Sequence, residues 1–245
     1  MENGLISTIR EAGRIILSAH DAEKSVEVKP GEANFVTYYD KAVQEFLFER
    51  LGALYPDFAF VGEEEGADDI ARLTGGRAFV IDPIDGTTNF MRGFRHSSVS
   101  VALCEDGEVR LGAVLIGRDS TRALHVSPRP LENGLVLFGT TPYYAETYDE
   151  TFRILRKLFE ASLDVRRIGS AALDLCMIAD GRGEAFFEVC LSPWDYAAGN
   201  LIVSEAGGIV TRIDGSPVQL NEKGSILAAS PDVLRQLRYL LDFQK

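Results

Sequence analysis

The chain has 245 residues, of which 46% are hydrophobic and 25% are charged. This is the composition of an ordinary globular protein, and it excludes a disordered chain, a coiled coil and a collagen-like repeat. Lys and Arg number 25 against 37 Asp and Glu, which gives a formal net charge of −12. Because a general nucleic-acid-binding protein needs a basic face, we expect no nucleic-acid partner.

The cysteines and the apolar runs bear on the compartment. Cys104, Cys176 and Cys190 are widely spaced and form no CxxC motif, so we expect free thiols in a reducing compartment. The first 20 residues mix charged and apolar side chains and therefore lack a signal-peptide core. No apolar run approaches the roughly 20 residues that cross a bilayer. We expect a soluble, cytoplasmic protein with no membrane partner.

The first half of the chain alternates helical and strand patterns. Apolar spacing predicts helices at 5–16 and 43–54, with a loop at 29–31 between them. A short apolar run at 78–81 predicts a buried strand that the following Asp82-Pro83 stops. Alternating residues at 98–104 and 109–113, joined by Asp106-Gly107, predict an antiparallel hairpin.

The second half again mixes helices and strands. The patterns predict strands at 121–126, 135–138, 184–189 and 209–213, and helices at 148–160, 172–179, 194–206 and from Ser230-Pro231 onward. The antiparallel turns exclude a simple doubly wound parallel sheet and favour an α+β or layered α/β architecture. The Pro- and Gly-flanked stretch at 128–133 predicts a boundary between two subdomains, at about 1–130 and 131–245, within a single unit.

Two clusters of acidic residues lie in the first half. Glu63, Glu64 and Glu65 follow an apolar stretch, and this cluster taken alone is better explained as a solvated loop. Asp82 and Asp85 lie where the buried strand ends, which is where ligand sites in α/β sheets are usually built. Clustered carboxylate oxygens suit hard cations such as Mg²⁺ or Mn²⁺.

The residues after Asp85 add a phosphate-binding signal. Gly86 permits a close backbone approach, and Thr87 and Thr88 resemble the first turn of a helix, whose free N–H groups accept phosphate oxygens. The alternative is a plain strand–turn–helix junction capped by an aspartate. Acidic metal ligands beside a phosphate site are chemically coherent, because the metal offsets repulsion between the carboxylates and an anionic substrate.

Two further aspartates are candidates, each with a structural alternative. Asp195 begins the predicted helix at 194–206, and Asp40 precedes the helix at 43–54, so either could simply be an N-cap. The only tryptophan, Trp194, is expected in the core, and the pair Arg166-Arg167 is expected to be solvated. The three histidines share no motif, and the chain has no P-loop, GxSxG or GxGxxG.

Three motifs together resemble the inositol monophosphatase family. They are GEE at 62–64, DPIDGTTNF at 82–90 and WDYAAG at 194–199, in this order and at suitable spacing. The resemblance covers nearly the whole chain and implies a layered α-β-α-β-α sandwich of the sugar-phosphatase type. It also implies a Mg²⁺-dependent, lithium-sensitive phosphatase that forms a homodimer.

The resemblance assigns a metal role to five positions. One Mg²⁺ would be held by Glu63, Asp82 and the backbone carbonyl of Ile84. A second would be held by Asp82, Asp85 and Asp195. Two or three ions are implied, and Mn²⁺ is the expected substitute.

The resemblance also assigns roles around the phosphate. Asp40 and Glu63 would assist a third ion through water, which makes Asp40 an auxiliary residue. Gly86 and Thr87 would contact the phosphate, and Thr87 with Glu63 would orient the attacking water.

The alcohol part of the substrate has its own implied residues. Ser170 and Ala171 match the segment that lines the alcohol pocket, and Glu188 matches a position that binds a substrate hydroxyl. Asp85 and Asp195 would border the same space.

The implied reaction is direct hydrolysis of a small-molecule phosphate monoester, most simply inositol 1-phosphate, by activated water. An aspartyl-phosphate phosphatase would need Asp-x-Asp, whereas this chain has Asp-x-x-Asp at 82–85. A fructose-1,6-bisphosphatase or another sugar phosphatase on the same scaffold is the alternative within enzymes. A catalytically silent anion- or metal-binding protein is the alternative outside them.

Overall fold

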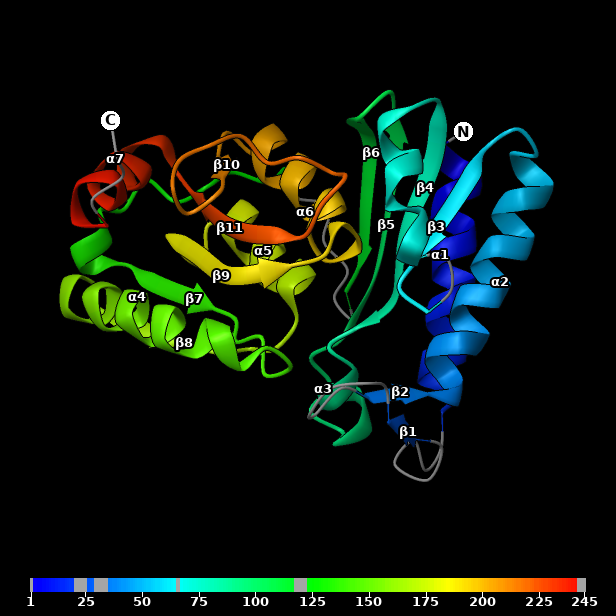
Figure 1. Ribbon diagram of the computed structural model, residues 1–245, viewed down its shortest axis with the longest axis horizontal. Coiled ribbons are helices and arrows are strands. Elements are labelled where there is room, and N and C mark those ends of the chain that lie inside the picture. Colours follow the sequence, from blue (N-terminus) through cyan, green and yellow to red (C-terminus); the bar gives the residue numbers. More distant parts are fainter. Residues whose placement is uncertain (1, 20–25, 29–34, 65–66, 117–122, 242–245) are drawn as a thin grey trace.

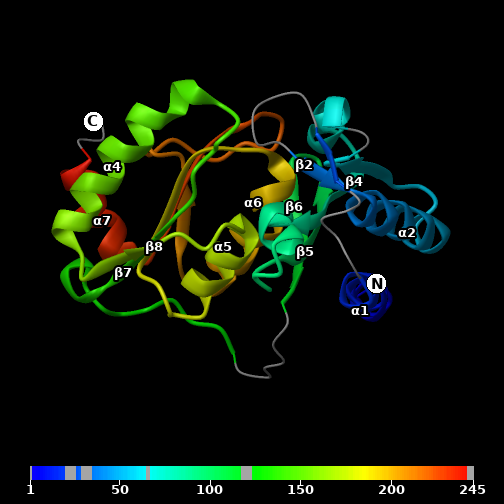
Figure 2. The same cartoon turned by 90° about the horizontal axis from the view of Figure 1, so that it is seen from below.

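A computed structural model describes residues 2–19, 26–28, 35–64, 67–116 and 123–241. Its helices and sheets form five layers in the order α-β-α-β-α, so the layered α+β architecture predicted from the sequence is confirmed (Figure 1). The view turned by 90° places α1 and α2 on one side of the molecule and α4 and α7 on the other (Figure 2).

The first sheet has four strands in chain order and is mostly antiparallel. Its strands are β3 (Ala59–Gly62), β4 (Arg77–Asp85), β5 (Ser98–Glu105) and β6 (Glu108–Leu115). Only β3 and β4 run parallel, and β5 and β6 form the predicted hairpin. The helices α1 (Glu2–Leu17) and α2 (Tyr38–Leu54) pack on its outer face.

The second sheet has five strands in the order β10-β11-β9-β7-β8. They are β7 (Leu135–Phe138), β8 (Asp164–Arg166), β9 (Ala185–Leu191), β10 (Ile209–Thr211) and β11 (Gly224–Ala229). β7 runs parallel to both of its neighbours, whereas β11 is antiparallel to both of its own. The helices α4 (Tyr148–Ala161) and α7 (Pro231–Leu240) cover its outer face (Figure 1).

Smaller elements complete the chain. They are the antiparallel pair β1 (Val26–Val28) and β2 (Phe35–Thr37), the short helix α3 (Thr87–Met91), and the 3₁₀ turns η2 (Ala67–Thr74), η3 (Leu131–Asn133) and η4 (Ala145–Thr147). Within the described ranges, no helix combines the length and the apolar character needed to cross a membrane. The three cysteines are free thiols.

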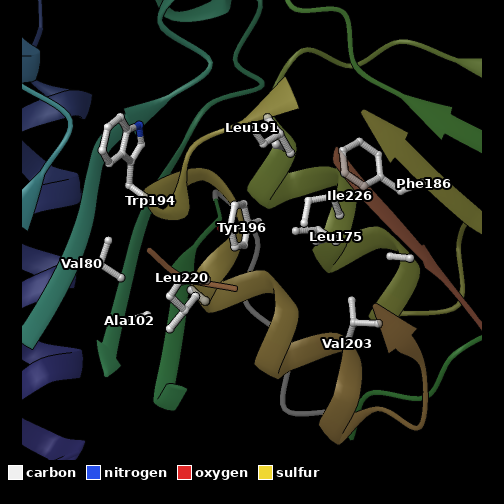
Figure 3. Packing of buried hydrophobic residues seen from close by; sticks show 14 of the residues in the cluster. Val80, Ala102, Leu175, Phe186, Leu191, Trp194, Tyr196, Val203, Leu220 and Ile226 are labelled. Atoms are coloured by element: carbon white, nitrogen blue, oxygen red, sulfur yellow. The ribbon is translucent and has the colours of Figure 1, made fainter. Parts of the chain in front are cut away.

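The middle layer joins the two sheets through one hydrophobic core. It consists of α5 (Ala171–Ala179) and α6 (Pro193–Glu205), which are apolar on most of their faces because sheets cover them from both sides. Val80 of β4 and Phe186 of β9 belong to the same core cluster as Tyr196 of α6 (Figure 3). The subdomain boundary near residue 130 stays a prediction.

Most helices and strands follow the sequence, but β4 does not stop at Pro83 as predicted. The strand runs on to Asp85, and its register with β5 shifts between Asp82 and Asp85. Its parallel partner β3 ends opposite Ile81, so no neighbouring strand requires an N–H from Pro83. Because the end of β4 is irregular, Asp82 and Asp85 can both turn away from the sheet at the same point.

The strand predicted at 121–126 is wrong for residues 123–126, which form no strand. Residues 121 and 122 and the predicted loop at 29–31 lie outside the described residues. The sequence also missed β8 and β11. β8 has only three residues, and β11 reads as a short apolar run without alternation because both of its faces are covered.

A close contact between β6 and α6 makes a testable prediction. A Cβ at Gly112 would lie 2.7 Å from the carbonyl oxygen of Ala198, which belongs to the rigid middle layer. Gly112→Ala should therefore lower the free energy of unfolding by about 1–3 kcal/mol in urea denaturation. The matched control is Gly52→Ala in α2, where the nearest atom to the new Cβ is 3.9 Å away, and it should stabilise the helix by about 0.5–1 kcal/mol. Equal effects at the two glycines would contradict the packing argument.

Candidate functional site

A cavity of about 300 Å³ opens between the two sheets, at one end of the middle layer. Its wall comes from the end of β4, the start of α3, the N-termini of α5 and α6, and the end of β9. The cavity brings together ten of the eleven site residues predicted from the sequence, namely Glu63, Asp82, Ile84, Asp85, Gly86, Thr87, Ser170, Ala171, Glu188 and Asp195. Asp40 is the exception.

The turn at Gly86 determines how the chain enters the cavity. Its φ is +90°, in the left-handed region that favours glycine. A Cβ at this position would lie 2.9 Å from the carbonyl oxygen of His96 and 3.0 Å from that of Gly169. Thr87 begins α3 directly afterwards, as predicted. The turn therefore brings the α3 backbone against the segment that precedes α5.

Asp85 connects the two halves of the site. Its Oδ2 accepts hydrogen bonds from the Ser170 hydroxyl and, at 2.7 Å, from the backbone N–H of Ala172. Burial raises the pKa of Asp85 to about 6, although these hydrogen bonds favour its charged form. The carboxylate is thus fixed in position by α5, although it belongs to β4.

A second link joins the same two segments. Asn89 of α3 donates through Nδ2 to the carbonyl oxygens of His96 and Ile168, each at 2.8 Å. It is buried, and both acceptors lie outside regular secondary structure. The amide therefore fixes the distance between α3 and the start of α5.

Asp82 is buried close to other acids. It is 1% exposed, and its Oδ1 is buried without a hydrogen-bond partner in the described part of the chain. Burial raises its pKa well above the ordinary value, and the charges of Glu63, Asp85 and Asp195 raise it further. Asp195 has the same direction of shift, again from burial first and then from Glu63 and Asp85. The four acids therefore repel one another across a single cavity.

Helix capping partly explains where Asp195 and Asp40 lie, although neither aspartate is itself the N-cap residue. The N-caps are Ser192 and Thr37, and each aspartate is the third residue of its helix. Asp195 Oδ2 accepts from the Ser192 N–H at 2.7 Å, and Asp40 Oδ2 accepts from the Thr37 N–H at 2.7 Å. These capping boxes hold the carboxylates in place, and Asp195 still faces the cavity.

Asp40 reaches the site through Thr87. It is fully buried, and its Oδ1 lies 3.2 Å from the Thr87 hydroxyl, which is also 3.2 Å from the Ile84 carbonyl oxygen. Burial raises the pKa of Asp40, and the nearby Glu63 adds to that shift. Asp40, which does not line the cavity itself, is thus placed to orient the Thr87 hydroxyl.

Several lining residues were missed by the sequence analysis. They are Asp174, Thr140, Tyr143, Tyr144 and Lys223. Arg167 is exposed, as predicted, but it also lines the cavity and donates through Nη2 to Thr140 at 3.3 Å. Asp174 had a usable signal, since it lies one helical turn after Ala171. The tyrosines and Lys223 lie outside any recognised motif.

The acids do not form a ready-made metal cage. Among the described residues, no three Asp, Glu, His or Cys side chains are grouped as ligands of an ion. Asp85 and Asp195 instead direct an oxygen toward backbone N–H groups. The donor set nevertheless fits a hard cation, because it consists of oxygens alone and includes the orphaned Oδ1 of Asp82.

Similarity to known proteins agrees with this geometry. The model of the inositol monophosphatase family matches residues 1–241. The chain belongs to the inositol monophosphatase family. Membership of this family supports a phosphatase, and the family motifs are those that line the cavity.

Relatives of this inositol monophosphatase family member carry two kinds of name. Nus factor SuhB of Pasteurella multocida is 34% identical over 97% of this chain and 94% of its own length. Inositol-1-monophosphatase of Bacillus subtilis is 33% identical over 92% of this chain and 90% of its own. The crystal structure of extragenic suppressor protein suhB from Bartonella henselae superposes with a TM-score of 0.86 at 28% identity, covering 98% and 97% of the two chains. The expected lack of a nucleic-acid partner stays a prediction.

Proposed function

We propose that the protein is a Mg²⁺-dependent phosphate monoester hydrolase that acts on an inositol phosphate. The observation that carries this proposal is the convergence of Glu63, Asp82, Asp85 and Asp195 on one cavity beside the Gly86 turn. A named inositol-1-monophosphatase among the relatives supports the substrate class.

The residues that would hold the metal follow from the donor set. Glu63, Asp82 and the Ile84 carbonyl would hold one ion, and Asp82, Asp85 and Asp195 a second. Such ions would offset the mutual repulsion that raises the carboxylate pKa values. When bound, Mg²⁺ supplies positive charge that neutralises the phosphate, acidifies water and stabilises the departing alkoxide. Mn²⁺ is the expected substitute, and a third, weaker ion would involve Glu63 and Asp40.

The remaining roles belong to the chain itself. Gly86 and Thr87 would bind the phosphate, with the Gly86 turn allowing the backbone to approach closely. Thr87, oriented by Asp40, would act with Glu63 to position the attacking water. This gives Glu63, Thr87 and Asp85 their proposed catalytic roles.

The alcohol would contact Ser170 and Ala171. They line the cavity together with the buried Glu188, which accepts from the Thr141 hydroxyl at 3.3 Å. Glu188 would take a substrate hydroxyl. The homodimer and the lithium sensitivity that the resemblance implies stay predictions.

A second candidate is a sugar bisphosphatase such as fructose-1,6-bisphosphatase. One observation favours it, which is that Arg167 and Lys223 both line the cavity. Lys223 is held against Tyr144, whose hydroxyl oxygen is 3.0 Å from its Nζ. Two cations beside an acidic site would suit a second phosphate group on the substrate.

A substrate panel tests the proposal. Rates of phosphate release are measured with inositol 1-phosphate, fructose 1,6-bisphosphate and 3′-phosphoadenosine 5′-phosphate, with Mg²⁺ and with EDTA. We expect turnover of inositol 1-phosphate that EDTA abolishes and that Asp85→Asn loses. Fast bisphosphate turnover without inositol phosphate turnover would favour the second candidate. Phosphate or Mg²⁺ binding without any turnover would indicate a non-enzymatic binder, and full activity in Asp85→Asn would contradict the metal role of Asp85.

A further inference from the structure

Asp174 is a buried acid without a partner. It lies in α5, one turn after Ala171, and lines the cavity, with only 1% of its surface exposed. Both of its carboxylate oxygens are buried, and neither has a hydrogen-bond partner among the residues that the structure describes. Buried polar groups in folded proteins are nearly always hydrogen-bonded, and leaving two oxygens unpaired is costly. Because Asp174 lies in a cavity wall, this unfavourable free energy points to a ligand that donates hydrogen bonds to its carboxyl oxygens.

The surroundings of Asp174 indicate the chemistry of that ligand. The charge that acts on it most strongly is Glu188 on β9, followed by Asp85, and Arg167 opposes both. Burial and these acids raise the pKa of Asp174 well above its ordinary value, so its charged form is disfavoured. A neutral hydroxyl suits such a carboxyl better than a cation does, because it can donate to the ionised form and can accept from the O–H of the protonated form.

We propose that Asp174 and Glu188 form a two-carboxyl subsite for the leaving alcohol, in which Asp174 binds a second hydroxyl of the substrate. This rests on the proposed phosphatase function and narrows its substrate class. With Glu188 binding one hydroxyl and Asp174 another, the pair favours alcohols with at least two free hydroxyls, such as a cyclitol or a sugar. Asp174 is then a specificity-determining residue.

Two substrates and three variants test this subsite. Inositol 1-phosphate is compared with p-nitrophenyl phosphate, whose leaving group has no further hydroxyl. Asp174→Leu keeps a similar volume but removes both acceptors, and Asp174→Asn keeps one acceptor. The control is Asp180→Asn at the other end of α5, where the aspartate pairs with Arg182 at 2.8 Å and does not line the cavity. KM and kcat are measured for each variant, together with the Tm without substrate.

We expect Asp174→Leu to raise KM for inositol 1-phosphate about tenfold or more and to leave KM for p-nitrophenyl phosphate within about twofold. Asp174→Asn should show a smaller selective change, and Asp180→Asn none. The Tm of both Asp174 variants should equal or exceed that of the wild type, because no hydrogen bond of the free protein is lost.

Other outcomes would overturn the inference in distinguishable ways. Equal losses on both substrates, or a lower Tm in both Asp174 variants, would make Asp174 a structural residue. Unchanged KM values would mean that no substrate hydroxyl reaches it. A wild-type protein inactive on both esters with Mg²⁺ would overturn the proposed phosphatase itself.

Discussion

Asp82→Asn is expected to lower kcat for inositol 1-phosphate by at least about a thousandfold, because positioned metal charge contributes several kcal/mol to the transition state. The same substitution should raise the Tm of the metal-free protein by about 2–8 °C. The reason is that Asp82 is buried, has an oxygen without a hydrogen-bond partner among the described residues, and is repelled by four neighbouring acids, Glu63, Asp85, Asp195 and Asp40. Steady-state kinetics and thermal unfolding in EDTA measure the two effects.

The control for Asp82 is an aspartate with the opposite environment. Asp214 accepts a hydrogen bond from the Ser216 N–H at 2.9 Å, which lowers its pKa, and it lies outside the cavity. Asp214→Asn should keep full activity and should not raise the Tm. A lower Tm in Asp82→Asn, or activity close to that of the wild type, would show that Asp82 supports the fold and not the reaction.

Without divalent cations, the free energy of unfolding should fall as the pH rises from 4.5 to about 8. Burial raises the pKa of Glu188 from 4.5 to about 8, so in this range the folded state binds more protons than the unfolded state. Stability then decreases with pH, because it follows the difference in bound protons. Asp85 adds to the decrease at the lower end, since its pKa rises from 3.8 to about 6. We expect these two groups to give a loss on the order of 6 kcal/mol.

Glu188→Gln tests which group causes this slope. The variant should have a flatter profile above pH 6, where Asp85 has titrated. The control is Glu150→Gln, because the hydrogen bond from Arg153 lowers the pKa of that half-buried glutamate, which is the opposite direction to the shift of Glu188. Urea denaturation at several pH values in EDTA measures the profiles. A stability that stays constant or rises between pH 4.5 and 8 would contradict the raised pKa values.

The sequence was sufficient to predict the helices and most of the site because their signals are local. Apolar spacing predicts α1, α2 and α4, and Ser230 caps α7 as expected, since its hydroxyl accepts from the Val233 N–H. The DPIDGTTNF motif carries its own strand end, turn and helix start. Ten of the predicted site residues therefore line one cavity, although the roles proposed for them await the experiments above.

The parts that the sequence did not predict depend on long-range contacts. Asp174 is inconspicuous in a helical pattern, and its importance arises only because β9 brings Glu188 near it. Arg167 is exposed as predicted, but the sequence does not show that it lines the cavity beside Thr140, which lies 27 positions earlier. The sequence offered Asp40 and Asp195 as N-cap residues, whereas the actual N-caps lie three positions earlier. A Ser or Thr at the N-cap and an Asp three residues later are both typical of helix starts, so the pattern alone did not distinguish them.

The cavity wall is built from two kinds of chain segment. The four acids Glu63, Asp82, Asp85 and Asp195 lie in β3, β4 and α6 or in the turns next to these elements. The hydrophobic core that joins the two sheets determines the positions of these elements. Tyr143, Tyr144 and Lys223 come from connecting segments outside the helices and strands, and Lys223 lies 3.0 Å from the Tyr144 hydroxyl. Replacement of these connections would therefore alter which alcohol is accepted and leave the hydrolytic apparatus intact. A scaffold of this kind can diversify its substrates by exchanging surface segments, without having to evolve its chemistry again.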